Sequence, residues 1–450
     1  MTREPGRGLP AFGLGFALRN GGRAFHHRNY RLFFAGQLTS LVGTWMQQVA
    51  QAWLVLQITN DPFVLGLVTA LAFLPVLALG LFGGVLADAL PKRQTLVATQ
   101  AVQMMLAFVL FGLVATGTVQ VWHILVLAGL LGVTNAVDMP TRQAFTVEMV
   151  GRDDVANAVA LNSAVFNGAR IIGPAVAGLT IGAFGGDVSM AFLINGISFL
   201  AVIIAYAAMR EEDLHNPPPL LRPHTIREVR TTIAGGLRYV RGTDLVLLVT
   251  LNVGIVATFG MNFGVTIPAL AQQVLHTDAT GYGFLMTASG IGSLVAALAI
   301  AFSGKSRPVL VPLGAILLGI ALTAAAVVHV YALAIVAMLF VGLGAIGMAA
   351  TANTTIQLAV PDELRGRVIS VYTTVFVGST PIGGLLMGWI ASAFGVDVSL
   401  AVGGIGAVVT GAIMLAWMRR IRGARLFAPT TGAVRPAPTG GAVPMPARPR

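Results

Sequence analysis

The stretch Gly182-Ala-Phe-Gly-Gly-Asp-Val-Ser-Met-Ala191 occurs a second time in this chain. It recurs without a gap as Ser392-Ala-Phe-Gly-Val-Asp-Val-Ser-Leu-Ala401. The same register aligns further positions before the repeated stretch, namely Val165-Phe166 with Val375-Phe376, Gly168 with Gly378, Gly173 with Gly383 and Gly178 with Gly388. A pattern repeated in parallel over this distance predicts two halves of similar structure.

The composition is that of a membrane protein. Hydrophobic residues make up 56% of the 450 positions and charged residues only 10%, whereas a soluble chain carries roughly a quarter charged residues. The absence of Cys excludes disulfides, thiolate catalysis and Cys-ligated metals. The His residues lie in the tails or near the ends of apolar runs, so we expect no metal centre, no cofactor and no catalytic dyad.

Long apolar runs, separated by short polar or Gly/Pro breaks, predict twelve membrane-spanning helices. Each run has roughly the 17–25 residues, or more, that a membrane helix needs. The predicted spans are 30–58, 62–87, 93–116, 121–141, 157–184, 188–209, 244–273, 281–303, 308–328, 331–353, 367–394 and 397–418. Together with the repeat, they predict an all-α membrane protein in which two six-helix bundles are related by pseudo-twofold symmetry.

The basic residues are distributed unevenly between the predicted loops. All but one of the 28 Lys and Arg residues fall in the two tails and in every second loop, and the alternate loops contain none. The positive-inside rule places the basic loops and both termini in the cytoplasm. The formal net charge of +11 therefore reflects topology, and we expect no nucleic-acid partner. The exception is Arg170, which lies inside the fifth span.

These boundaries divide the chain into five segments. Residues 1–29 are predicted to be a cytoplasmic tail without the apolar core of a signal peptide. Residues 30–209 and 244–418 are the two bundles, and the Pro-, Ala- and Gly-rich residues 419–450 are expected to be disordered. Residues 210–243 form a cytoplasmic linker, whose apolar residues have helical spacing at Ile226, Val229, Ile233, Leu237 and Val240. With its Arg residues, this pattern predicts an amphipathic helix on an anionic leaflet.

The loop between the second and third spans contains a recognisable pattern, formed by Gly84, Asp88, Lys92 and Arg93. Gly84 permits close helix approach, and Asp88 and Lys92 have an i, i+4 spacing. The pattern resembles the loop 2–3 signature of the major facilitator superfamily, although Ala89 and Pro91 replace a basic residue and a Gly of that signature. The resemblance implies a cytoplasmic gate, and the alternative is an ordinary positive-inside loop.

The inner end of the fourth span carries Asp138 and, four residues later, Arg142. The resemblance implies that Asp138 joins the loop 2–3 residues in a charge cluster that holds the cytoplasmic side shut. The alternative is an i, i+4 salt bridge between Asp138 and Arg142 at the membrane surface. The stretches 135–144, 167–178 and 361–368 are similar to those of the transmembrane secretion effector branch of the superfamily, and the resemblance covers nearly all of residues 28–420.

The fifth span reads Asn-Gly-Ala-Arg-Ile-Ile-Gly-Pro-Ala-Val-Ala-Gly from position 167 to position 178. Gly173, Pro174 and Gly178 resemble the Gly-Pro-x-x-Gly-Gly signature of superfamily exporters, with Ala177 in place of its first later Gly. The resemblance implies export rather than import. Because Pro lacks a backbone N–H, we expect Gly173-Pro174 to interrupt the helix.

Arg170 is predicted to lie near the membrane midplane, where an unpaired Arg costs at least ~2.5–3.5 kcal/mol. A water-filled cavity, the side chain of Asn167, Gln side chains of the first span or an anionic group on the substrate could offset this cost. The alternative role is structural, as a contact for the carbonyl group that Pro174 leaves without a partner.

Uncharged polar side chains gather on one face of the first span, at Gln37, Thr44, Gln48 and Gln51. The seventh span offers Asn252 and Asn262. Amides in hydrocarbon need partners or water, so these residues are predicted to line a cavity or to contact another helix. Neutral amides interleaved with aromatic residues suit an amphipathic solute of medium size.

We therefore predict a monomeric exporter in a bacterial inner membrane, acting on a small organic molecule such as a drug-like compound or a siderophore. Because no nucleotide-binding motif is evident, we expect alternating access driven by an ion gradient, and the resemblance implies protons as the coupling ion. Asp88 and Asp138 are the candidate proton carriers, since no Asp or Glu lies near a predicted midplane. The alternatives are an importer or symporter of the same fold and a non-transporting membrane sensor or scaffold.

Overall fold

The computed structural model describes residues 22–215, 226–303 and 307–422, and within these ranges the chain is helical with no strand. The first part contains η1 (Arg23–His26), α2 (Arg28–Thr59), α3 (Pro62–Ala89), α4 (Lys92–Ala115), α5 (Val121–Ala183), α6 (Ser189–Ala207) and η2 (Glu211–Asp213). The second part contains α7 (Ile226–Gly242), α8 (Asp244–Gly260), α9 (Phe263–Ala269), the π-helix η3 (Leu270–Val274), α10 (Ala279–Ser303), α11 (Leu310–Val327), α12 (Tyr331–Ala359), α13 (Asp362–Phe394) and α14 (Val396–Arg422). The predictions for residues 1–21 and 423–450 lie outside the described residues.

The twelve predicted spans fall in described helices, and the seventh extends over α8, α9 and η3. Ten helices of the described residues are long and apolar enough to cross a membrane. One of them, α5, has 63 residues and contains both the fourth and the fifth predicted spans. The first predicted span lies in α2, which is not among the ten because its Gln side chains lower its hydropathy.

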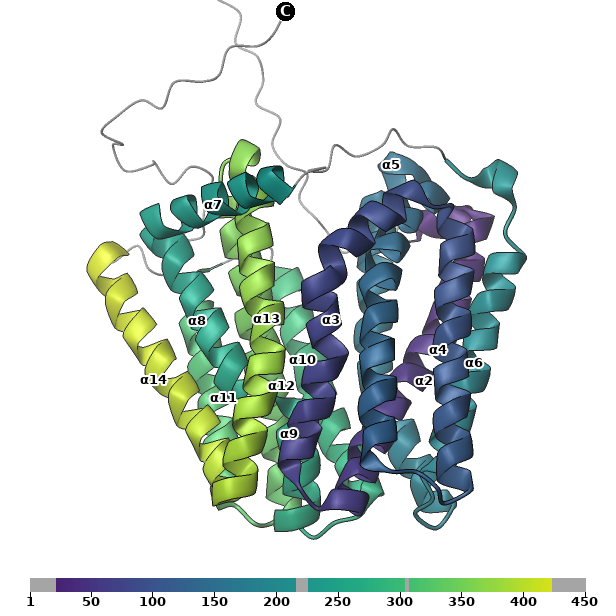
Figure 1. Ribbon diagram of the computed structural model, residues 1–450. Helices are drawn as coiled ribbons and strands as arrows, with labels where there is room; N and C mark the ends of the chain where they lie inside the picture. Colours follow the sequence, from purple (N-terminus) through teal and green to yellow (C-terminus); the bar gives the residue numbers. More distant parts are fainter. Residues whose placement is uncertain (1–21, 216–225, 304–306, 423–450) are drawn as a thin grey trace, which may run out of the picture.

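The helices form two groups that lie side by side (Figure 1). Helices α2 to α6 make up the N-terminal half and α8 to α14 the C-terminal half, while α7 lies across one end of α8 and α13. We call the end that carries α7 and the start of α4 the basic side, and the end that carries the start of α3 the opposite side. The halves meet along two helix pairs, α3 with α13 and α5 with α10.

The sequence repeat reappears as equivalent contacts in the two halves. A Cβ added to Gly173 of α5 would lie 2.4 Å from an atom of α2, and one added to the equivalent Gly383 of α13 would lie 2.3 Å from an atom of α8. The second pair crosses between the halves, because Gly178 approaches α10 at 3.0 Å and Gly388 approaches α3 at 2.8 Å. Each small residue allows two backbones to approach closely, so both halves use the same helix packing.

Two helix interruptions differ from the sequence prediction. The backbone of α5 stays helical through Gly173-Pro174, and its described non-helical residue is Gly151, with φ 71°. Glycine tolerates this positive φ, and the residue separates the fourth span from the fifth. The seventh span, predicted as one helix, is instead broken at Asn262, which caps α9 after α8 ends at Gly260.

The predicted amphipathic helix of the linker forms as α7 and packs on the start of α13. A Cβ at Gly236 would lie 2.6 Å from the carbonyl oxygen of Arg367. Val240 is buried in the same region, and the hydroxyl of Tyr239 donates to the carbonyl of Ala359 at 3.5 Å. The small residue in α7 therefore allows the linker helix to lie directly against the C-terminal half.

Candidate functional site

Small residues join the two halves on the opposite side. A Cβ at Gly66 of α3 would lie 2.4 Å from the carbonyl oxygen of Gly384 on α13. A Cβ at Gly283 of α10 would lie 2.5 Å from the carbonyl oxygen of Pro174 on α5. Backbones this close leave no room for a solute, so this side of the path between the halves is closed.

The described side-chain hydrogen bonds between the halves lie on the same side. Gln273 donates to the carbonyl of Asn60 at 2.9 Å, and Thr280 donates to the carbonyl of Gly178 at 3.1 Å. Deeper in the protein, the Thr287 hydroxyl donates to the carbonyl of Ile171 at 3.3 Å. The rings of Trp53 and Tyr282 stack across the two halves with centroids 6.2 Å apart. The closure therefore extends from the opposite side to the level of Ile171.

None of the described ion pairs of the basic side joins the two halves. Lys92 binds Glu148 of α5, with Nζ and Oε1 2.8 Å apart. Because α3 ends at Ala89 and Lys92 begins a new helix, the i, i+4 spacing of Asp88 and Lys92 does not lie on one helix. The side chain of Asp88 lies outside the described residues. Gly84 is buried near the end of α3, where the adjacent Gly83 would bring a Cβ within 1.9 Å of the Ala136 carbonyl.

Arg93 connects α4 to the end of α6. Its Nε donates to the carbonyl of Tyr206 at 2.7 Å, and Nη2 donates to the carbonyl of Ala207 at 2.9 Å. Its Nη1 binds the carboxylate of Glu211 at 2.9 Å. A cation at a helix C-terminus satisfies carbonyl groups that have no partner within the helix. Arg93 therefore holds the start of the linker against the N-terminal half.

Asp138 lies in a buried polar network rather than at the surface. Its side chain is 0% exposed and forms an ion pair with Arg142, one turn away on α5. The hydroxyl of Thr99 and the amide of Gln100, both on α4, donate to Asp138 Oδ1 at 2.7 Å and 2.9 Å. Arg142 also donates to Gln37 Oε1 at 3.1 Å. The predicted pairing of Asp138 with Arg142 is therefore present, but inside the protein, and the described partners of Asp138 do not include Lys92 or Arg93.

The polar residues of the first span have different environments. Gln37 is buried against Arg142, whereas Gln48 is exposed and Gln51 is half-buried. The hydroxyl of Thr44 donates to the backbone of its own helix, at the carbonyl of Ser40. Gln37 therefore belongs to the Asp138 network, and Gln48 is the member of this set whose side chain is exposed.

The two Asn residues of the seventh span are buried. Asn252 donates to Met348 Sδ at 3.4 Å, and its Oδ1 has no hydrogen-bond partner. Asn262 donates to the carbonyl of Thr258 at 2.7 Å, where α8 gives way to α9. Asn262 thus stabilises the helix break, while Asn252 retains an unused acceptor.

Arg170 lies on α5 just beyond the closed region. Its Nη2 atom is buried and has no hydrogen-bond partner. Asn167, one turn away, donates to the carbonyl of Ser163 at 2.8 Å. A contact between the Arg170 guanidinium and Asn167, one of the alternatives considered from the sequence, is thus absent from the described hydrogen bonds.

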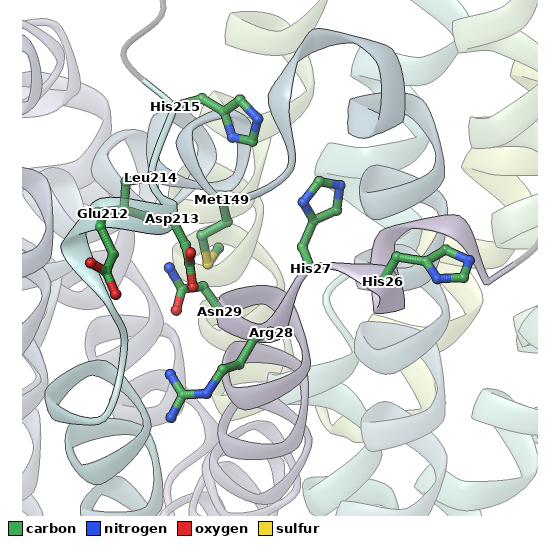
Figure 2. Close-up of a pocket in the computed structure, with 9 residues that line it drawn as sticks. All are labelled: His26, His27, Arg28, Asn29, Met149, Glu212, Asp213, Leu214 and His215. Atoms are coloured by element: carbon green, nitrogen blue, oxygen red, sulfur yellow. The ribbon is translucent and has the colours of Figure 1, made fainter.

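A second polar site lies on the basic side, where the linker begins (Figure 2). A cavity of about 490 Å³ is lined by His26, His27, Arg28, Asn29, Met149, Glu212, Asp213, Leu214 and His215. His27 Nε2 is 3.0 Å from Asp154 Oδ2, and the backbone N–H of His215 donates to the carbonyl of Glu148 at 2.8 Å. These contacts attach η1 and the start of the linker to α5. Within the described residues, no group of three or more His, Cys, Asp or Glu side chains could hold a metal ion.

A sequence profile of the transmembrane secretion effector family matches residues 23–427. The chain belongs to this family. This secretion effector is 25% identical to the Staphyloferrin A transporter of Staphylococcus aureus over 387 residues, covering 84% of this chain and 93% of that protein. It is 30% identical to the Multidrug efflux pump Tap of Mycolicibacterium fortuitum over 383 residues, covering 81% of this chain and 89% of the pump. It is 22% identical to Macrolide efflux protein A of Streptococcus pyogenes over 380 residues, covering 82% and 92% of the two chains.

Solved structures with the same architecture are also transporters. The peptide transporter POT superimposes with a TM-score of 0.70 at 13% identity, covering 89% of this secretion effector and 95% of that chain. A bacterial homologue of the lysosomal transporter Spinster, in an inward-facing conformation, superimposes with a TM-score of 0.63 at 14% identity, covering 88% and 95%. The protein is therefore a multi-pass membrane transporter of small molecules with the major facilitator fold, and not an enzyme.

Several residues of the polar networks did not emerge from the sequence. Thr99 and Gln100 donate hydrogen bonds to Asp138, and Glu148 forms an ion pair with Lys92. The polar run Thr99, Gln100 and Gln103 in an apolar span was a usable signal, because its members share one helical face. The pairing of Lys92 with Glu148 had no local signal, because the residues are on different helices.

Proposed function

We propose that this protein exports a small organic molecule from the cytoplasm by alternating access, in exchange for protons. The observation that carries the proposal is the closure of one side only. The exporter-signature residues Pro174 and Gly178 contact α10 of the other half on the opposite side. None of the described ion pairs of the basic side joins the two halves. Two relatives are named as efflux proteins, which supports the direction.

The topology of the proposal follows the basic residues. The basic side faces the cytoplasm of a bacterium, both termini lie there, and the protein acts as a monomer in the cytoplasmic membrane. Residues 30–209 and 244–418 are the two moving bundles, and residues 210–243 connect them. With the opposite side closed, the path between the bundles opens toward the cytoplasm and accepts the solute from there.

To release the solute on the opposite side, the transport cycle needs a conformation in which the basic side is closed. We assign this gate to the loop between α3 and α4 and its neighbours, with Gly84, Asp88, Lys92, Arg93, Asp138 and Arg142. Lys92 and Arg93 are held at the surface of the N-terminal half by Glu148 and Glu211. To close the gate, Lys92 and Arg93 would exchange these partners for groups of the C-terminal half when the bundles rotate. Gln48, Gln51, Arg170 and Asn252 are proposed to contact the solute on its path.

Asp138 is the proposed proton carrier. Its carboxylate is buried and forms an ion pair with Arg142, so protonation would remove the negative charge and leave Arg142 without a counter-ion. Loss of one partner of a buried pair is costly. A proton on Asp138 would therefore favour a rearrangement of α2, α4 and α5 around this network, which is the coupling that antiport requires.

Everted membrane vesicles test the proposal, using a panel of anionic, neutral and cationic fluorescent dyes. We expect uptake of at least one dye into vesicles that contain the protein, with loss of uptake when an ionophore collapses the proton gradient. Uptake that is insensitive to the ionophore would contradict proton coupling. Accumulation of the same dye in intact cells would show an importer. A membrane sensor or scaffold would transport no dye and would tolerate replacement of Gln48 or Arg170.

A further inference from the structure

The position of Arg170 on α5 places it between the two helices that flank the path. Ile171 and Gly178 mark the face of α5 that contacts α10. Gly173 marks the face that contacts α2. Successive residues of a helix are about 100° apart, so Arg170 lies between these two faces. Ile172, on the other side of α5, is exposed with 47% of its surface accessible. Arg170 therefore lies on the side of α5 between α2 and α10, away from the exposed Ile172.

Along the path, Arg170 lies where the closed region ends. Its carbonyl oxygen would be 3.3 Å from a Cβ added to Gly290 of α10, so the backbones of the two halves are still close at this level. Toward the basic side, Ser163 occupies the same face of α5 two turns away and is exposed. Arg170 is thus at the edge of the close contact between the halves, on a face of α5 that is exposed farther toward the basic side.

Nothing in the described part of the chain neutralises this charge. Arg170 is in none of the described ion pairs, and its buried Nη2 has no hydrogen-bond partner. The symmetric position in the C-terminal half is Thr380, so the repeat itself does not require a cation here. A cation without a counter-ion inside a membrane-spanning segment is unfavourable and marks a functional site. The missing counter-charge is therefore to be sought in the cargo.

We propose that the transported solutes are amphipathic organic acids and that Arg170 binds their carboxylate. This inference rests on the proposed function and names its substrate class. A guanidinium presents paired N–H donors that match a carboxylate. One turn away, Phe166 is 47% exposed and packs edge-to-face on Trp45, with centroids 5.7 Å apart. This aromatic surface provides a contact for the apolar part of the same solute.

Export of an anion from a negatively charged cytoplasm is favoured by the membrane potential. Proton entry and anion exit would then act in the same direction. Because the solute itself supplies the negative charge, the binding site needs no carboxylate near the midplane. Residues 157–184 contain no Asp or Glu, in agreement with this.

The natural absence of Cys allows a direct test of the charge that Arg170 presents to the path. Ser163→Cys in the full-length protein, in detergent micelles at low ionic strength, is labelled with anionic sulfonatoethyl methanethiosulfonate or cationic trimethylammonioethyl methanethiosulfonate. The introduced thiol would lie about 10 Å from residue 170 along the helix. Loss of one positive charge at that distance should lower the ratio of anionic to cationic labelling rates about fourfold, even with the dielectric constant of water. We expect this change in Arg170→Thr, which introduces the residue of the symmetric half, and its recovery in Arg170→Lys.

Benzoate and benzamide then test the carboxylate. We expect benzoate to slow the labelling of Ser163→Cys in the protein with Arg170, to have little effect in Arg170→Thr, and benzamide to have little effect in either. An unchanged rate ratio in Arg170→Thr, or equal protection by benzoate and benzamide, would overturn the inference. Neither measurement requires transport. Protection by benzoate without dye uptake in vesicles would therefore refute the proposed export while leaving the anion site in place.

Discussion

The contact between Gly66 and Gly384 offers a way to open the closed side. In Gly66→Ala the new Cβ would lie 2.4 Å from the Gly384 carbonyl oxygen, whereas ordinary contact begins at 3.4 Å. The neighbouring atom belongs to the backbone, so α3 and α13 must separate by about 1 Å, either locally or by movement of the whole halves. Overpacking of this kind costs about 1–3 kcal/mol. The cost applies only to the conformation in which α3 and α13 touch, so the population of the alternative conformation should rise roughly 5–150-fold.

Thiol labelling measures this population. Thr280 lies in the closed α5–α10 contact, so Thr280→Cys should react slowly with a membrane-impermeant reagent applied from the opposite side. We expect Gly66→Ala to increase that rate roughly 5–150-fold, in proportion to the opened population. Gly80→Ala is the matched control on α3, because a Cβ at Gly80 meets no atom within 4 Å. Equal rates in the Gly66→Ala and Gly80→Ala proteins would refute the reasoning that the glycine contact keeps this side closed.

Three further substitutions test the polar contacts. Asp138→Asn should reduce the free energy of unfolding by about 3–5 kcal/mol, because it leaves Arg142 unpaired. Thermal unfolding measures the loss, with Glu363→Gln at an exposed position as the control, and equal melting temperatures of the two variants would contradict the prediction. Arg93→Ala should lower the free energy of unfolding by about 1.5–3 kcal/mol, because it removes charge-assisted hydrogen bonds to α6. Arg152→Ala, at an exposed position, should leave it nearly unchanged, and similar decreases in the two variants by thermal unfolding would contradict the role of Arg93. Arg170→Ala should insert into the membrane at the normal level but lose export, measured as dye uptake into everted vesicles. Ile172→Ala, at an exposed position of the same helix, should retain export. Normal export by Arg170→Ala would show that Arg170 has only a structural role.

The candidate site was partly visible in the sequence. Asp138 and Arg142 stand out as charges at the end of an apolar run, and Arg170 as a charge inside one. Their partners could not be predicted in the same way. Lys92 is four residues from Asp88 but binds Glu148 on another helix, because α3 ends between the two basic-loop positions. Gln37 shares a helical face with Gln48 but is covered by Arg142 of α5.

The sequence by itself determined the membrane class, the spans and the two repeated halves of this protein, and it predicted the sidedness. These properties follow from the transfer of single segments into lipid and from the charge of single loops, which depend on local composition. The tertiary structure alone decided which side is closed, where α5 and the seventh span are interrupted, and which polar groups meet. Those outcomes depend on which helices become neighbours. Glycines such as Gly66, Gly178 and Gly283 permit the approach, but only the packed bundle shows which backbone each of them contacts.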